Sequence, residues 1–452
     1  VLEYTAKQVF ETTVGDTAPL ASIIANAKEA VKPVDGSPEA LAPTGFAWNT
    51  NQTPDAAAVA NPDYVTRNVK MTLRDSSGKT RDINIPVTIK VNLKTPQIAD
   101  DQVKLQGGLP NRSITVTDVT PGATVTLTIG NQTIKKEVPA GATSVIFTPP
   151  INPSSPNKNN GEIDYTAFPN GVLPTGEITV KQEKEVTLPD GGKETLTSGV
   201  TTKEITKETE APEPTFDLYI QNDKTKQWEK QSIQDTVRPG ARGYEIFAGD
   251  KIKIVISGKD NSGKIKTLKL HDGTSDIDRI FQKDYSSDDS APGFKDTPTE
   301  ASTTNPAIRE YTATYDENKQ YADGNRWNRG VKAVDLSDNE ARTLTVVAQG
   351  KLSKKFPGKV PATVQVTNAT TPSADDKEKI LAAVKGSNPE KANRISKYEF
   401  KNGGAVSKGK VTVVITYKDG TSNEVEVPVS DSDYKSEQAS QSASTSAVAS
   451  TS

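Results

Sequence analysis

Short runs in which apolar and polar residues alternate recur along the whole chain, and they limit what it can fold into. Four examples are Ser113–Asp118 (SITVTD), Thr124–Ile129 (TVTLTI), Lys251–Ile256 (KIKIVI) and Val411–Thr416 (VTVVIT). Alternation with a period of two, rich in threonine and valine, predicts half-buried β-strands. Turn residues separate such runs at intervals of about 8–12 residues, which is typical of β-sandwiches rather than of a parallel sheet.

Two segments have helical rather than strand periodicity. In the first, Asp16 precedes TAPLASIIANAKEAVK and is the predicted N-cap. In the second, Ser373 precedes ADDKEKILAAVKG, with Asp376 placed for a capping box and Gly386 for a C-cap. The apolar stripes of the two helices consist of Leu20, Ile23, Ile24 and Ala27, and of Ile380, Leu381 and Val384.

Each predicted helix belongs to one copy of an internal repeat. A strand, a polar turn with a glycine and a second strand ending in Pro-Val follow each helix, at Val69–Val87 and at Val411–Val429. Because proline cannot donate to a β-ladder, Pro86 and Pro428 should lie at an edge or near a strand end. Two small α+β modules are therefore predicted, one near each end of the chain.

With 452 residues the chain is too long for one hydrophobic core. We expect a mainly β protein, an elongated multidomain rod of tandem Ig-like β-sandwiches flanked by the small helix–hairpin modules. The expected domains are a module (1–92), a sandwich (93–213), a second sandwich (214–357), a module (358–432) and a serine-rich segment (433–452).

The serine-rich segment ends in SEQASQSASTSAVASTS, with serine at nearly every second position. It has one aliphatic side chain larger than alanine, Val448, and no aromatic residue after Tyr434. Such a segment cannot offset the entropy of ordering, so disorder is predicted. Tracts of this composition are also substrates for glycosylation, which stiffens them into stalks.

Composition excludes several classes of function. The chain has no cysteine, which excludes disulfides, thiolate metal sites and a cysteine nucleophile, and one histidine cannot build a histidine-rich metal site. The formal net charge of −3 gives no basic field for nucleic acid, and no apolar run reaches the length of about 20 residues that spans a bilayer. We expect neither nucleic-acid binding nor membrane insertion.

Three motifs resemble sites of chemistry without completing one. Gly258–Ile265 (GKDNSGKI) is one residue short of a phosphate-binding loop and has no following helix, so a hairpin turn is expected. The acidic loops His271–Arg279 and Tyr285–Ser290 lack the EF-hand order, so solvated loops are favoured and no cofactor is expected, with a structural calcium ion left open. His271 lies next to Asp272, but no glycine-flanked serine accompanies the pair.

The candidate ligand-binding residues are Trp327, Asn328 and Arg329, within YADGNRWNRGVKAVDLSDNEARTLTVVAQG. Strand alternation places Trp327 and Arg329 on one face together with Val331. An arginine in a core-facing position needs a partner or an exit to solvent. Two interpretations follow: a guanidinium whose stem covers apolar surface beside Trp327, or a guanidinium presented to a carboxylate ligand beside a sugar-packing aromatic ring.

The C-terminal half of the sequence resembles the ligand-binding regions of serine-rich-repeat glycoprotein adhesins of streptococci and staphylococci. The resemblance covers residues 214–452 and rests on three features: the aromatic-x-Arg strand with its VDLSDN turn, the module with DDKEKILAAVKGSNPE and VTVVITYKDGT, and the serine tract that follows. In the siglec-like branch of that family, an aromatic-Thr-Arg motif binds sialylated glycans. Here Trp327, Asn328 and Arg329 take those places, with asparagine in place of threonine.

The resemblance implies a cell-surface adhesin, not an enzyme, anchored to the cell wall through a C-terminal region outside this sequence. The implied partner is a host glycan, sialylated in one branch, or a host protein such as fibrinogen, fibronectin or keratin bound in grooves between domains. Two alternatives stay open: domains that act only as structural spacers, and a surface hydrolase of host glycans. The sequence also leaves open whether Lys–Asn crosslinks form.

Overall fold

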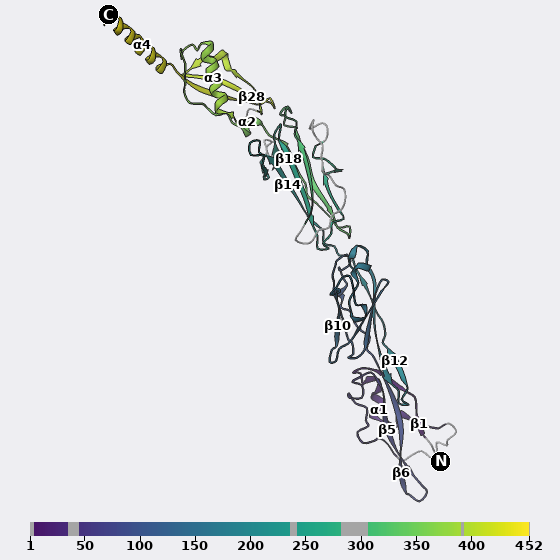
Figure 1. The fold of residues 1–452 in the computed structure, drawn as a ribbon. Coiled ribbons are helices and arrows are strands. Elements are labelled where there is room, and N and C mark those ends of the chain that lie inside the picture. Colours follow the sequence, from purple (N-terminus) through teal and green to yellow (C-terminus); the bar gives the residue numbers. More distant parts are fainter. Residues whose placement is uncertain (1–3, 35–44, 236–241, 282–305, 390–392, 452) are drawn as a thin grey trace. The chain divides into compact units, whose positions relative to one another are not determined.

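The computed structural model describes residues 4–34, 45–235, 242–281, 306–389 and 393–451, with side chains placed up to residue 441. The chain forms two compact units, Val1–Thr209 and Glu210–Ser452 (Figure 1), called here the N-terminal and C-terminal units. Both are built mainly of β-sheets, so the predicted mainly β, multidomain fold class is confirmed. Among the described residues, four clusters of buried apolar side chains form the cores, two in each unit.

The first core belongs to an α+β module, called the N-terminal module. Its four-stranded sheet has the order β2-β6-β5-β4, in which β2 runs parallel to β6 and the other pairs are antiparallel. Val69, Val87 and Ile89 point from the long hairpin into the core. The strands are β1 (Tyr4–Ala6), β2 (Phe10–Thr13), β3 (Val31–Pro33), β4 (Gly45–Trp48), β5 (Asp63–Arg74) and β6 (Thr80–Asn92).

The helix predicted after Asp16 is present only as three short pieces. These are the 3-10 turn η1 (Ala18–Leu20), α1 (Ala21–Ala25) and the 3-10 turn η2 (Ala27–Ala30). Asp16 Oδ1 accepts a hydrogen bond from the Ala18 N–H at 3.0 Å, as a capping residue should. Asn26 adopts an extended conformation, with φ −144° and ψ 104°, and its side chain caps η2 instead. The prediction of one continuous helix is wrong because asparagine competes for local backbone hydrogen bonds.

The second core fills a β-sandwich in the same unit. One sheet has the order β12-β11-β8-β9 with β13 also paired to β11, and the other consists of β10 and β7. The predicted strand Thr124–Ile129 is β8, and Val125, Leu127 and Ile129 alternate into the core. The other strands are β7 (Ile114–Thr117), β9 (Gln132–Glu137), β10 (Ser144–Phe147), β11 (Gly176–Thr187), β12 (Lys193–Thr197) and β13 (Thr201–Ile205).

The third core lies in the sandwich of the C-terminal unit, called the C-terminal sandwich. Its sheets have the orders β15-β14-β18-β21 and β16-β17-β24-β22-β19-β20, with β23 paired to β22. Its strands are β14 (Glu213–Gln221), β15 (Trp228–Lys230), β16 (Gln234–Asp235), β17 (Arg242–Ile246), β18 (Lys251–Lys259), β19 (Thr267–His271), β20 (Asp276–Ile277), β21 (Ala307–Thr314), β22 (Arg326–Val334), β23 (Glu340–Arg342) and β24 (Thr345–Gln349).

The fourth core belongs to the C-terminal module, which repeats the N-terminal one. Its sheet has the order β25-β29-β28-β26, and β25 again runs parallel to the last strand. The predicted repeat is therefore confirmed as a shared topology of strand, helix and three further strands. The elements are α2 (Leu352–Lys355), β25 (Val364–Gln365), α3 (Ala374–Ser387), β26 (Ile395–Phe400), β27 (Val406–Ser407), β28 (Lys410–Tyr417) and β29 (Ser422–Ser430).

The predicted capping box of α3 is confirmed. Ser373 Oγ accepts from the Asp376 N–H at 3.1 Å, and Asp376 Oδ2 accepts from the Ser373 N–H at 3.0 Å. The predicted C-cap at Gly386 is wrong, because α3 continues to Ser387 and Asn388 follows it. The Asn388 side chain donates to the Val384 carbonyl at 2.7 Å, which satisfies an orphan acceptor of the last turn without a glycine.

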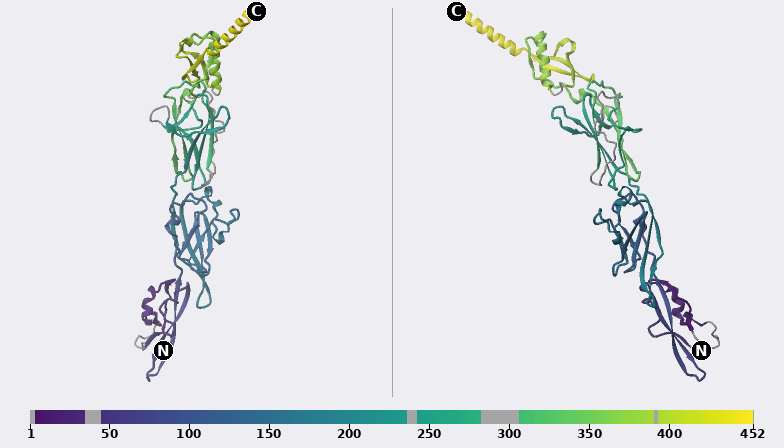
Figure 2. Two further views of the ribbon diagram at one scale, coloured as in Figure 1. Left: turned by 90° about the vertical axis from the view of Figure 1, so that its left-hand side faces the viewer. Right: turned by 45° about the vertical axis from the view of Figure 1, so that its right-hand side comes forward.

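The serine-rich segment forms helix α4 (Ser432–Thr451), which extends away from the module in both views of Figure 2. The prediction of disorder is therefore wrong for the backbone. The segment contains no proline or glycine, and alanine, glutamine, glutamate and lysine are good helix formers. Nothing is buried by α4 in the part whose side chains are described, so intrinsic propensity is its main support. Among the described helices, none is long and apolar enough to cross a membrane.

Candidate ligand-binding site

Strand β22 carries the candidate residues in the register predicted from the sequence. Trp327, Arg329 and Val331 face the interior of the C-terminal sandwich, whereas Asn328 is exposed. Residues 326–329 of the strand pair with β24, and residues 330–334 pair with β19. Of the three candidates, only Asn328 presents its side chain to solvent.

Trp327 is part of the aromatic core. Its ring centroid lies 5.1 Å from that of Phe281 and 5.8 Å from that of Tyr315, and the residue is 7% exposed. Such offset and edge-on pairs stabilise a core beyond the area they bury. In this arrangement Trp327 supports β22 from inside and offers no ring face to a sugar.

Arg329 is bound to the protein itself. It is 2% exposed, its Nε donates to the Ile280 carbonyl at 2.6 Å, and its Nη1 donates to the Asn328 carbonyl at 2.6 Å. The guanidinium lies 5.9 Å from the centroid of the Trp327 ring. These contacts match the structural interpretation of Arg329, and they fix the backbone that carries Asn328.

The surface beside Asn328 combines a polar turn with an exposed apolar side chain. Asp272 Oδ1 accepts from the N–H groups of Thr274 and Ser275, at 2.9 and 2.7 Å. These bonds, Ser275 first, hold the pKa of Asp272 at about 2. Leu344 is 53% exposed and adjoins Gly273, since a Cβ built on that glycine would lie 3.4 Å from Leu344 Cδ2.

His271 is not placed as a general base. It is buried, its Nδ1 accepts from the Gly273 N–H at 3.0 Å, and its Nε2 lies 2.8 Å from the Thr343 carbonyl oxygen. With Nδ1 as acceptor, Nε2 is the donor to the Thr343 carbonyl. Its role is to hold the turn after β19 against the segment before β24.

The other predicted motifs are turns and ion pairs. Gly258–Ile265 contains a tight turn in which the Gly263 N–H donates to the Asp260 carbonyl, so the turn is confirmed. The prediction of a hairpin is wrong, because β18 and β19 on either side of the turn belong to different sheets. In the loop after β19, Asp276 pairs with Lys332 at 2.7 Å and Asp278 pairs with Arg279 at 3.4 Å. The loop Tyr285–Ser290 lies outside the described residues.

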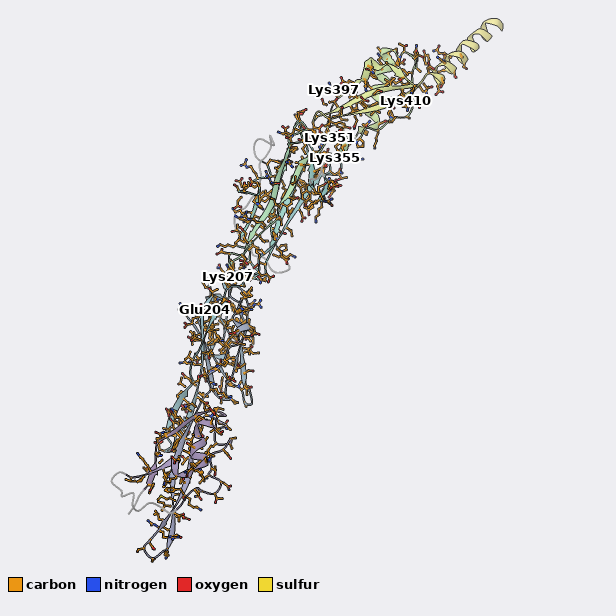
Figure 3. All side chains as sticks on the ribbon, turned by 180° about the vertical axis from the view of Figure 1, so that it is seen from behind. Glu204, Lys207, Lys351, Lys355, Lys397 and Lys410 are labelled. Carbon is orange, nitrogen blue, oxygen red and sulfur yellow. The ribbon has the colours of Figure 1, made fainter. Side chains whose placement is uncertain are left out.

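A cleft of about 400 Å³ lies between the C-terminal sandwich and the C-terminal module. Polar side chains of the β14–β15 turn form one wall, and aromatic and cationic side chains near α2 form the other. Lys351 is the N-cap of α2 and Lys355 is its last residue; both are labelled in Figure 3. The lining includes Asn222, Lys224, Glu229, Phe247, Lys355 and Phe356.

A buried charge network forms the floor of this cleft. Arg394, 3% exposed, donates to Asp250 Oδ1 at 2.9 Å, to both oxygens of Asp223 at 3.1 and 3.2 Å, and to the Ala248 carbonyl at 2.7 Å. Lys355 Nζ lies 3.1 Å from the same Asp250 oxygen. Burial alone would raise the pKa of Asp223, but Arg394 lowers it below its ordinary value. The two domains are thereby locked together by groups that cannot separate without exposing buried charge.

Sequence reasoning missed this junction. Asp250 and Arg394 are 144 residues apart in the chain, and each stands in an ordinary polar turn sequence. Phe247 and Ala248 belong to the core of the C-terminal module although they directly follow β17 of the sandwich. The one local indication of the junction is that these two apolar residues follow a strand and have no partner in its sheet.

No family model and no curated protein matches the chain. Among solved structures, it is similar to the sialic acid binding region of the Streptococcus sanguinis SK1 adhesin bound to 3'sLn, with 19% identity and a TM-score of 0.34 over 49% of this chain and 48% of that one. It is also similar to the SrpA adhesin of Streptococcus sanguinis, with 19% identity and a TM-score of 0.34 over 50% and 96%.

A third similar structure is a Ca2+-stabilized adhesin with which an Antarctic bacterium binds ice, with 12% identity and a TM-score of 0.23 over 89% of this chain and 86% of that one. The chain thus spans about half of the SK1 adhesin structure and nearly all of the SrpA structure. These neighbours are binding domains of adhesins. At these identities and TM-scores, no ligand or residue role is carried over from them.

Proposed function

We propose that the chain is the ligand-binding region of a bacterial cell-surface adhesin, displayed on a glycosylated serine-rich stalk that is anchored to the cell wall. The observation that supports this most is the locked junction of the C-terminal unit. A sandwich and a small module are held in one geometry around an open, charged and aromatic cleft, and the serine-rich segment follows directly. Many such regions on one cell would convert weak single-site binding into firm attachment.

One candidate surface within this proposal lies at Asn328. Its proposed ligand is a host glycan, and the resemblance to siglec-like adhesins implies that this glycan is sialylated. The exposed Asn328 amide, the adjoining Asp272–Ser275 turn and the exposed Leu344 combine hydrogen-bonding groups with an apolar contact, which is what sugar binding requires. In this proposal Trp327 and Arg329 act mainly by positioning the strand that presents Asn328.

A second candidate surface is the cleft, and its ligand class is a segment of a host protein such as fibrinogen, fibronectin or keratin. The volume of about 400 Å³ suits an extended peptide better than a globular surface. Phe247 and Phe356 supply apolar contact, while Lys224 and Glu229 lie on the rim for polar recognition.

The test is binding of the full chain to a mixed array of sialylated glycans and host matrix proteins, together with a turnover assay on a chromogenic glycan. Asn328→Ala removes the exposed amide, Thr225→Trp obstructs the cleft, and Ile308→Ala on the opposite sheet is the matched control. We expect binding without turnover, lost in one of the first two variants and kept in the control. Turnover would indicate the hydrolase alternative, and no binding at all would indicate spacer domains.

Arg329→Lys separates the two roles of Arg329. Lysine keeps the charge but cannot reproduce both carbonyl hydrogen bonds of the guanidinium. If Arg329 positions Asn328, this variant lowers glycan affinity together with thermal stability. Loss of affinity at unchanged stability would instead show that the guanidinium contacts the ligand directly.

A further inference from the structure

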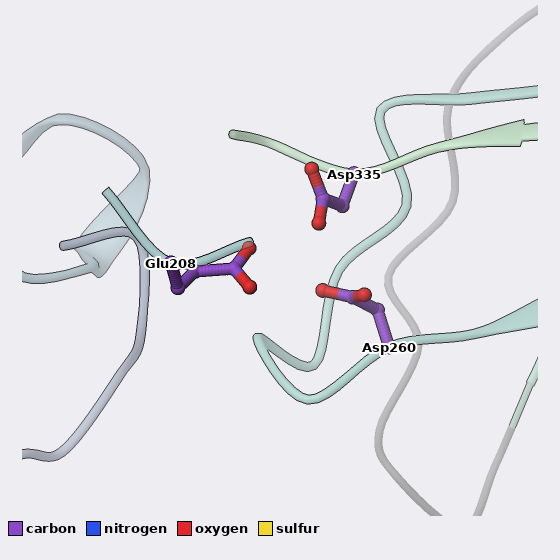
Figure 4. Close-up of side chains that lie close together, drawn as sticks. All are labelled: Glu208, Asp260 and Asp335. Atoms are coloured by element: carbon purple, nitrogen blue, oxygen red, sulfur yellow. The ribbon is translucent and has the colours of Figure 1, made fainter. Parts of the chain in front are cut away.

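Two acidic side chains come together in the C-terminal sandwich, each just after the end of a strand. Asp260 follows β18 and Asp335 follows β22. Carboxylate oxygens of the two lie within 4.8 Å of each other, and the residues are 5% and 0% exposed. Figure 4 shows both carboxylates turned toward one another; the figure also draws Glu208, which belongs to the N-terminal unit.

In the described part of the chain, the hydrogen-bond partners of this pair are neutral donors. Asp335 Oδ1 accepts from the Ser337 and Asn339 N–H groups at 2.9 and 2.8 Å, and its Oδ2 accepts from Asn339 Nδ2 at 3.0 Å. Asp260 Oδ2 accepts from the Ser262 N–H at 3.1 Å and from Ser262 Oγ at 2.5 Å. Within the described ranges, no lysine or arginine forms an ion pair with either carboxylate. Two buried like charges without a counter-charge are costly.

Two buried oxygens, one from the pair itself and one from the next residue in the chain, accept no hydrogen bond in the described part of the chain. They are Asp260 Oδ1 and Asn261 Oδ1. The Asn261 amide nitrogen is already engaged, since it donates to Glu210 Oε2 at 2.9 Å, and this fixes which end of the side chain is the carbonyl. A buried oxygen that accepts nothing costs free energy, so both atoms call for a positively charged or protic partner.

The chemistry of these atoms selects the class of ligand. Carboxylate and amide oxygens on turns are the ligands that calcium prefers, whereas transition metals favour nitrogen and sulfur. A pocket of about 150 Å³ borders the site and is lined by Glu210, Ala211, Glu213, Lys259, Asp260 and Asn261, so acidic groups outnumber the one lysine in its lining. Its lining has no aromatic side chain to pack on a sugar, but its acidic groups would attract a cation and leave room for its waters.

We propose that Asp260 and Asp335 bind a calcium ion, with the Asn261 carbonyl oxygen and water completing the coordination. The ion neutralises the buried carboxylate pair and ties the turn after β18 to the turn after β22. Burial, with smaller contributions from the charges of Asp335 and Glu210, raises the pKa of Asp260 although the Ser262 hydrogen bonds lower it, so a shared proton is the competing way to neutralise the pair. A calcium site with only two carboxylates should have a dissociation constant of about 0.1–1 mM.

The test is thermal unfolding of the full chain by calorimetry, in EDTA and with CaCl2 at concentrations well above the expected dissociation constant. Calcium at 100 times its dissociation constant should raise the Tm of the C-terminal transition by roughly 5 °C. Asp260→Asn and Asp335→Asn should each abolish this rise, whereas Asp276→Asn, which removes an exposed carboxylate paired with Lys332, should keep it. MgCl2 should give a smaller rise than CaCl2.

Stability in EDTA and calorimetric titration distinguish a loss of calcium binding from poor folding of the variants. In EDTA, Asp260→Asn should be at least as stable as the wild type, because it removes the repulsion between the two carboxylates. Calorimetric titration with CaCl2 should show one site fewer in Asp260→Asn. The proposal is overturned if CaCl2 changes neither the Tm nor the titration, and it is replaced by the shared proton if wild-type stability instead rises on acidification from pH 7 to 5.

Discussion

The two α+β modules share one topology but are attached to their sandwiches by opposite means. In the N-terminal unit, Lys90 contacts Glu194 of the sandwich at 3.9 Å and lies 5.7 Å from the Tyr64 ring, with side chains that remain partly exposed. In the C-terminal unit, Arg394, Asp250 and Asp223 form the buried network described above. The charged contact is therefore exposed and weak in the N-terminal unit, where Tyr64 also packs against the sandwich core, and it is buried in the C-terminal unit, where it fixes the geometry of a cleft.

The difference teaches that topology alone does not make a binding region. Exposed ion pairs contribute about 0–1 kcal/mol and are screened by salt. Breaking a buried pair leaves an uncompensated charge and costs about 3–5 kcal/mol. On this basis the C-terminal unit should keep its cleft geometry under conditions in which the N-terminal contact contributes little.

The largest effect is expected for Arg394→Ala. It leaves Asp250 buried with only Lys355 as a cationic neighbour, so the C-terminal unit should lose about 3–5 kcal/mol of unfolding free energy. Denaturant unfolding of the full chain measures this. Arg342→Ala, which removes an exposed pair with Glu340, is the matched control and should cost less than about 1 kcal/mol. Equal effects of the two variants would contradict the comparison.

The next effect concerns the helix that distinguishes the modules. Asp376 accepts from Thr367 N–H and Oγ1 and from Ser373 N–H, at 2.9, 2.7 and 3.0 Å. Asp376→Ala should therefore destabilise the C-terminal unit by about 2 kcal/mol. Asp16→Ala, which removes one exposed bond in the N-terminal module, should cost about 0.5 kcal/mol. Similar costs would show that α3 does not depend on its cap.

Acid titration tests how much the Asp376 carboxylate stabilises the C-terminal unit. Burial raises the pKa of Asp376, but the hydrogen bonds from Thr367, Ser373 and Asn368 outweigh it and hold the pKa far below the ordinary value of 3.8. A carboxyl whose pKa is lower in the folded state stabilises the fold above its unfolded pKa and loses that contribution as pH falls below it. Wild-type stability should thus fall below about pH 4, and Asp376→Asn should flatten that fall in urea unfolding measured from pH 5 to 2.

The smallest effect is expected at the N-terminal contact. Glu194→Gln removes the pairing with Lys90 and should cost less than about 1 kcal/mol at low salt. At 1 M NaCl the difference from the wild type should vanish. A cost above 2 kcal/mol that persists in high salt would erase the contrast between the two attachments.

Local patterns were enough to predict the strands and the repeat. Alternation located β8, β18 and β28, and the capping box located the start of α3, because these depend on neighbouring residues. The break at Asn26 and the helix α4 were not predicted, because there weak propensities decide the outcome without a core to reinforce them. The four cores lie within the predicted domains apart from Phe247, Ala248 and Leu352, while the predicted boundaries themselves stay predictions.

The candidate site was predictable only in part. The register of Trp327, Asn328 and Arg329 follows from alternation, but whether Arg329 reaches solvent depends on the carbonyl of Ile280, 49 residues away. The cleft depends on Asp223, Asp250 and Arg394, which meet only in the folded chain. Tertiary contacts of this kind leave no periodic pattern in the sequence.

The central claim is that the C-terminal unit carries the ligand site of an adhesin. The most direct test compares residues 1–209 with residues 210–452, each checked for folding by circular dichroism, on the same array of sialylated glycans and matrix proteins. The account predicts that residues 210–452 bind as the full chain does and that residues 1–209 do not bind. Binding confined to residues 1–209 would contradict it.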